Sequence, residues 1–118
     1  MKSTRTTLPE ILVSKLPALQ ELCKKYKVMN LWAFGSVLTE KFTQDSDIDL
    51  LYEMDKSVIE KGKYLYNLDG LIAGLLTLFS GRKLDLLHYP GLKNPYFIEE
   101  VDETKVLLYD KNAEEVLI

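Results

Sequence analysis

Two apolar runs flank a polar loop in residues 28–54, which read VMNLWAFGSVLTEKFTQDSDIDLLYEM. The first run, residues 28–34, is rich in strand-forming residues and ends at Gly35-Ser36, which predicts a buried strand followed by a turn. Residues 43–46 are polar and predict a loop before a second strand over residues 47–54. We expect residues 37–42 to form a short helix that opens at Ser36.

Outside this stretch, apolar residues recur at helical spacing in two segments and form short apolar runs in two others. Thr7 is a candidate cap for the first helix, Pro17 divides that helix into two pieces, and Asn94 caps the last one. The expected helices cover residues 8–27, 64–79 and 95–101, the expected further strands cover residues 83–89 and 105–110, and the tail from Asn112 forms a helical turn. Helices that alternate with short strands predict an α/β or α+β sheet domain.

Length and composition limit the possible classes of protein. A chain of 118 residues fits one domain over residues 1–118, and 47% hydrophobic with 28% charged residues is typical of a globular protein. The net charge of -3 argues against direct nucleic acid binding, which needs clustered lysine and arginine. A single cysteine permits no internal disulfide, and no apolar run is long enough to span a membrane. We therefore expect a cytoplasmic protein.

The motif Asp47-Ile48-Asp49 opens the second predicted strand. Residues i and i+2 of a strand point to the same face, so the two carboxylates should emerge side by side. Two adjacent carboxylates repel unless a cation lies between them, and magnesium commonly binds one or two carboxylates together with phosphate oxygens. The alternative is a solvated strand end, but the apolar Leu50-Leu51-Tyr52 that follows indicates a buried strand.

Two other features have weaker chemical meaning when taken alone. Glycine allows backbone amides to approach a ligand closely, and amides at a helix start favour phosphate, so Gly35-Ser36 is either a phosphate site or an ordinary turn. Asp85 interrupts the apolar run Leu84 to Leu87, and an acid buried there needs a donor, a cation or a metal ion. Otherwise Asp85 faces water from an edge strand.

These pieces, taken in order, resemble the polymerase-beta-like nucleotidyltransferase superfamily. The signature is present as Phe34-Gly35-Ser36, ten further residues, and Asp47-Ile48-Asp49-Leu50-Leu51. The third acid follows within Gly81-Arg82-Lys83-Leu84-Asp85-Leu86. The resemblance covers roughly residues 16–110 and is strongest to the minimal nucleotidyltransferases. It implies a short mixed sheet of about four strands with helices packed on it and the active site at one end.

The resemblance also implies the roles of the site residues. Asp47, Asp49 and Asp85 would be catalytic and would bind two magnesium ions, with Asp85 helping to activate the incoming hydroxyl. Gly35 and Ser36 would hold oxygens of the triphosphate of ATP. Two metal ions can stabilise both the attacking and the leaving oxygen of an in-line displacement. In this comparison the protein mainly positions the substrates and neutralises charge.

The sequence departs from related minimal proteins in one respect. Those proteins often carry arginine after Gly-Ser, whereas this chain has Val37-Leu38-Thr39-Glu40, so one candidate phosphate-binding cation is missing. Lys41 and Arg82 are the possible substitutes. The chain also has no extra domain to hold base and acceptor, so the acceptor or a partner is expected to complete the site.

Three functions fit these observations. Minimal proteins of this kind resemble the antitoxin of a toxin–antitoxin pair, which implies transfer of AMP to a tyrosine of a HEPN-domain toxin. The second possibility is a binding module that inhibits such a toxin by occlusion, since the arginine is missing. The third is a nucleotidyltransferase for a small molecule. An oligomer is compatible with all three.

Overall fold

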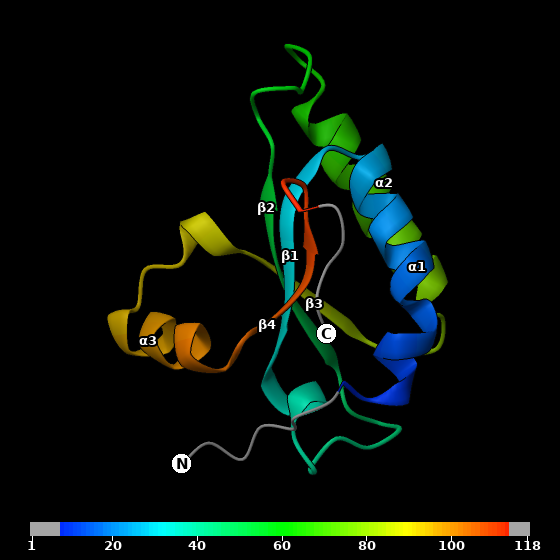
Figure 1. The fold of residues 1–118 in the computed structure, drawn as a ribbon, viewed down its shortest axis with the longest axis vertical. Helices are drawn as coiled ribbons and strands as arrows, with labels where there is room; N and C mark the ends of the chain where they lie inside the picture. Colours follow the sequence, from blue (N-terminus) through cyan, green and yellow to red (C-terminus); the bar gives the residue numbers. More distant parts are fainter. Residues whose placement is uncertain (1–7, 114–118) are drawn as a thin grey trace.

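A computed structural model describes residues 8–113 of the chain. A four-stranded mixed sheet forms its centre, in the order β3-β2-β1-β4 (Figure 1). The central strand β1 pairs antiparallel with β2 and β4, and β2 pairs parallel with β3. The elements in chain order are α1 (Glu10–Lys25), β1 (Val28–Phe34), the 3-10 helix η1 (Gly35–Leu38), β2 (Ile48–Met54), α2 (Tyr64–Leu78), β3 (Leu84–His88), the 3-10 helix η2 (Tyr89–Gly91), α3 (Pro95–Thr104) and β4 (Val106–Asp110). The predicted fold class is confirmed.

Helices lie on both faces of the sheet, and the two faces differ in how far they are covered. α1 and α2 lie side by side over one face, whereas the shorter α3 lies on the other side (Figure 1). Under α1 and α2, alternate strand residues form the main core with helix residues, all of them buried: Leu12, Leu19, Leu31, Ile48, Leu50, Leu71, Leu75 and Leu108. Under α3 a smaller cluster forms around Phe34, Leu51 and Val101. This division leaves part of the second face open for a site.

Two glycines of α2 allow the helix pair to pack closely. A Cβ added at Gly70 would overlap the ring of Tyr26, and one added at Gly74 would overlap Leu22.

In the part of the chain that the structure describes, no helix combines the length and the apolar character that crossing a bilayer requires.

The predicted break of the first helix at Pro17 is wrong. α1 is continuous, with Pro17 inside it and the buried Leu12 and Leu19 on either side. An internal proline costs about 3 kcal/mol, and burial of each leucine contributes about 1.5–3 kcal/mol, so packing on the sheet outweighs the local break. The proposed Thr7 cap lies outside the described residues, as does most of the tail after Asn112.

The helix expected over residues 37–42 is shorter than predicted. η1 ends at Leu38 because Thr39 adopts an extended conformation, with φ -126° and ψ 170°. The Thr39 backbone N–H and hydroxyl both donate to the Ser36 carbonyl, each at 2.9 Å. The first bond is the i to i+3 bond of the 3-10 turn, and the second adds a side-chain bond at its C-terminal end. The Asn94 cap is confirmed, because its side chain accepts hydrogen bonds from the backbone of Tyr96 and Phe97.

Candidate functional site

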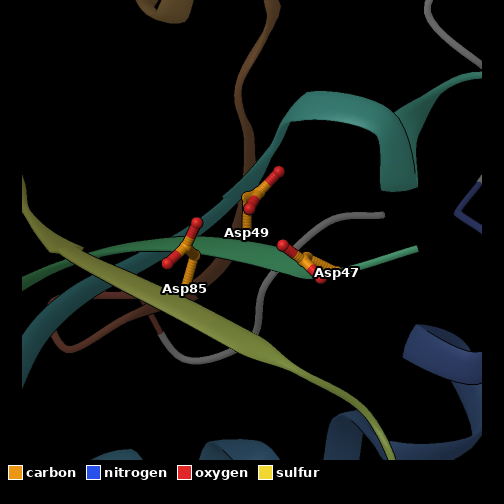
Figure 2. Close-up of side chains that lie close together, drawn as sticks. All are labelled: Asp47, Asp49 and Asp85. Carbon is orange, nitrogen blue, oxygen red and sulfur yellow. The ribbon is translucent and has the colours of Figure 1, made fainter. Parts of the chain in front are cut away.

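Three carboxylates meet at one end of the sheet. Each of Asp47, Asp49 and Asp85 has a carboxylate oxygen within 4.8 Å of the other two. Figure 2 shows the three side chains close together, with Asp47 immediately before β2, Asp49 near its start and Asp85 on the adjacent β3. Strand spacing alone pairs Asp47 with Asp49, the family resemblance adds Asp85, and the fold brings all three together.

The strand pattern explains this arrangement. Asp49 and Asp85 are directly opposed in the parallel register of β2 and β3, so both side chains leave the same face. Ile48 and Leu50, on either side of Asp49, are fully buried in the main core and fix which face Asp49 occupies. β3 is an edge strand and Asp85 is exposed, as one sequence interpretation expected, yet its carboxylate faces the other two acids.

The electrostatics of the cluster favour a bound cation. Burial, and after it the nearby charges of Asp85 and Asp47, raise the pKa of Asp49 to about 6. Among residues 8–113, no lysine or arginine forms an ion pair with any of the three acids. Clustered carboxylate oxygens are the ligands that magnesium and calcium prefer, and a divalent ion would relieve their mutual repulsion. The donor set therefore fits a hard divalent metal ion.

Gly35 lies directly against this cluster. Its φ of +78° is in the left-handed region, and an added Cβ would overlap the Asp49 carboxylate. Glycine is therefore required at this position both for its backbone conformation and for the close approach. As a result, the η1 segment that contains Gly35 and Ser36 lies beside the acids, where the sequence had placed a candidate phosphate site.

A cleft of about 400 Å³ continues from this segment between η1 and α3. Gly35, Ser36 and Lys41 line one wall, and Phe97 and Glu100 from α3 line the other. No sequence motif predicts the α3 wall, because its position depends on long-range packing. That packing includes an edge-to-face contact between Phe97 and Phe34, whose ring centroids are 6.0 Å apart.

The two candidate substitutes for the missing arginine differ in the structure. Arg82 donates to the carbonyls of Thr43 and Ser46 at 3.0 and 2.9 Å, and its guanidinium lies 4.5 Å from the ring centroid of Phe42. Arg82 thus holds the loop that leads into Asp47. Lys41, in contrast, lies in the cleft wall.

Comparisons with known proteins agree with this fold. A solved structure described as a "putative minimal nucleotidyltransferase" superposes with a TM-score of 0.64 at 28% identity, covering 86% of this chain and 96% of the other. A chain from the crystal structure of a toxin–antitoxin with AMP-PNP gives a TM-score of 0.58 at 15% identity, covering 82% and 74%, which is a likeness in fold.

Sequence relatives lead to the same conclusion. Two proteins of Methanocaldococcus jannaschii, each named "putative protein adenylyltransferase", are 36% and 31% identical to this chain. The first alignment covers 70% of this chain and 78% of the relative, and the second covers 75% and 85%. The model of the family described as "Polymerase beta, Nucleotidyltransferase" matches residues 18–114. The chain therefore belongs to the polymerase beta nucleotidyltransferase family, in which it resembles the minimal nucleotidyltransferases.

Proposed function

We propose that this chain uses magnesium to transfer AMP from ATP to an acceptor hydroxyl, and that the acceptor is a tyrosine of a HEPN-domain toxin. The observation that carries the proposal is the convergence of Asp47, Asp49 and Asp85, whose carboxylate oxygens lie within 4.8 Å of one another. Nothing on the described part of the chain neutralises these charges, whereas the magnesium ions that accompany a triphosphate would.

In the proposed reaction the three acids would hold the magnesium ions, which would supply neutralisation of the charge on the reacting oxygens. Gly35 and Ser36 bind phosphate oxygens and orient the nucleotide. The acceptor oxygen forms a bond to the α-phosphorus as the bond from that phosphorus to the bridging oxygen of pyrophosphate breaks. Asp85, which is exposed on the edge strand, is the acid that an incoming hydroxyl can reach, and we assign it acceptance of the hydroxyl proton.

The relatives support a protein acceptor and an adenine nucleotide. The M. jannaschii relatives carry the name "putative protein adenylyltransferase", and one structural neighbour comes from a toxin–antitoxin crystal with AMP-PNP. A partner would also complete a site that this small chain leaves open toward the solvent at Asp85.

A second candidate function is inhibition of the same toxin by occlusion, without catalysis. The segment after Gly35-Ser36 favours it, because Val37 and Leu38 are buried in the core and cannot bind phosphate. The two functions differ in what they require of the acids, since occlusion needs a surface and transfer needs the carboxylates.

The test is incubation of the protein with magnesium, ATP labelled in the α-phosphate, and the product of the neighbouring gene. We expect label on a tyrosine of the partner, loss of labelling in the double variant Asp47→Asn/Asp49→Asn, and normal labelling in Asp69→Asn. Asp69 is a matched control because it is exposed on α2, outside the acid cluster.

Each alternative gives a different result in this experiment. If the double variant labels the partner as well as the unaltered protein does, the carboxylates have no catalytic role. If neither the unaltered protein nor the double variant labels the partner, and the double variant still neutralises the toxin in cells, occlusion is the function. Label that appears on a small hydroxyl compound without any partner protein would instead favour a small-molecule transferase.

A further inference from the structure

The cleft between η1 and α3 is lined by Lys41, to which the proposed function assigns no role. We propose that Lys41 binds the phosphate tail of the nucleotide in this cleft and thereby takes the place of the missing arginine. This inference rests on the proposed function, because it needs a nucleoside triphosphate at Gly35 and Ser36.

The charges in the cleft and in the acid cluster beside it determine which way an anion can lie. The acids at Asp47, Asp49 and Asp85 and the Glu100 carboxylate on the α3 wall all repel phosphate unless a metal ion intervenes. Lys41 is the one lysine or arginine of residues 8–113 that lines the cleft, and it belongs to the same wall as Gly35 and Ser36. The phosphate tail is therefore expected along the η1 wall, on the side of Lys41 and away from Glu100.

Hydrogen bonds connect Lys41 to the phosphate-binding segment. The Lys41 backbone N–H donates to the Thr39 hydroxyl at 3.2 Å, and that hydroxyl donates to the Ser36 carbonyl at 2.9 Å. Thr39 thus fixes the backbone of Lys41 relative to Ser36. In the described part of the chain no hydrogen bond or ion pair occupies the Lys41 ammonium, so its flexible stem is available to a ligand.

Two other cations of the described residues, Arg82 and Lys105, are already engaged. The Arg82 guanidinium is bonded to two loop carbonyls and packs on Phe42. Lys105, at the end of α3, pairs with Asp102 at 2.9 Å and lies over the ring of Trp32. Lysine is a compact point charge that binds phosphate well without the planar geometry that arginine supplies.

The test compares two nucleotides that differ in their phosphates. Binding of AMP and of an ATP analogue with a methylene group between the α- and β-phosphates is measured by NMR titration in magnesium, which detects weak binding as well. We expect Lys41→Gln to weaken the triphosphate analogue about tenfold, as loss of a charge-assisted hydrogen bond does, and to leave AMP almost unchanged. Lys41→Arg should restore most of the affinity. Lys93→Gln is the matched control, because Lys93 is an exposed lysine outside the cleft.

The possible failures can be told apart. Equal weakening of both nucleotides by Lys41→Gln, or no weakening of either, would overturn the role of Lys41, while partner labelling by the unaltered protein would keep the proposed function. If the unaltered protein binds no triphosphate analogue at all, both proposals are overturned.

Discussion

Replacement of Gly35 by alanine tests the link between the η1 turn and the acid cluster. Gly35 has a φ of +78°, and a non-glycine residue in this region costs about 1–2 kcal/mol. The added methyl group would also overlap the Asp49 carboxylate, so that carboxylate must move. We therefore expect two separable effects, a loss of stability from the backbone and a loss of metal binding from the displaced acid.

The control is Gly62→Ala. Gly62 has a similar φ of +82°, but nothing lies within 4 Å of a Cβ added there. Both variants should lower the melting temperature by about 4–8 °C, which corresponds to the backbone cost in a chain of this size. Only Gly35→Ala should also weaken magnesium binding, by about tenfold or more, since loss of the groups that orient metal ligands commonly costs that much.

The assay is a magnesium titration of both variants, together with thermal unfolding followed by circular dichroism in the absence of metal. Equal magnesium affinity for Gly35→Ala and Gly62→Ala would refute the reasoning, because it would mean that the Asp49 carboxylate is not needed or does not move. A Gly35→Ala protein more stable than Gly62→Ala would contradict the expected overlap.

Two further predictions concern the acids and the loop before them. Because the pKa of Asp49 is raised to about 6, magnesium affinity should rise with pH up to about 6 and then level. For the same reason, the stability of the metal-free protein should fall as pH rises from about 4 to 6. Magnesium titrations and unfolding across this range check it, and an Asp49→Asn protein with the same pH profiles would disprove the assignment. Arg82→Ala should cost about 2 kcal/mol by removing the bonds to Thr43 and Ser46, and should weaken magnesium binding because the loop positions Asp47. Denaturant unfolding measures the first effect, and unchanged values for both would show that the loop needs no such support.

Strands were the most predictable elements, and burial is not the common reason, since no residue of β3 is fully buried. The strand expected over residues 28–34 matches β1. The strand expected over residues 47–54 is one residue longer than β2 at one end, and the strand expected over residues 83–89 is one residue longer than β3 at each end. Each is a short apolar run that ends at glycine, proline or polar residues, so local sequence and tertiary packing agree. Pro17 is the opposite case, in which packing of α1 on the sheet overrides a local signal.

The site was predictable only in part, because its components depend on different ranges of the chain. The shared face of Asp47 and Asp49 follows from strand periodicity, but the position of Asp85 opposite Asp49 depends on the parallel register of β2 and β3. The cleft depends on contacts of still longer range, because Lys41 and Glu100 line it from segments far apart in the sequence. Motif spacing and the family resemblance identified the acids, whereas the spatial arrangement of α3 required the structure.

The edge position of β3 gives Asp85 a consequence beyond chemistry. Edge strands present unpaired backbone groups that can join the sheet of a neighbouring molecule, and an exposed charge on such a strand discourages that joining. A neutral residue at this position would remove a carboxylate of the site. It would also remove a charge that discourages pairing of this edge strand with another molecule. Experiments that replace Asp85 therefore need a check for aggregation before any lost activity is attributed to the missing acid.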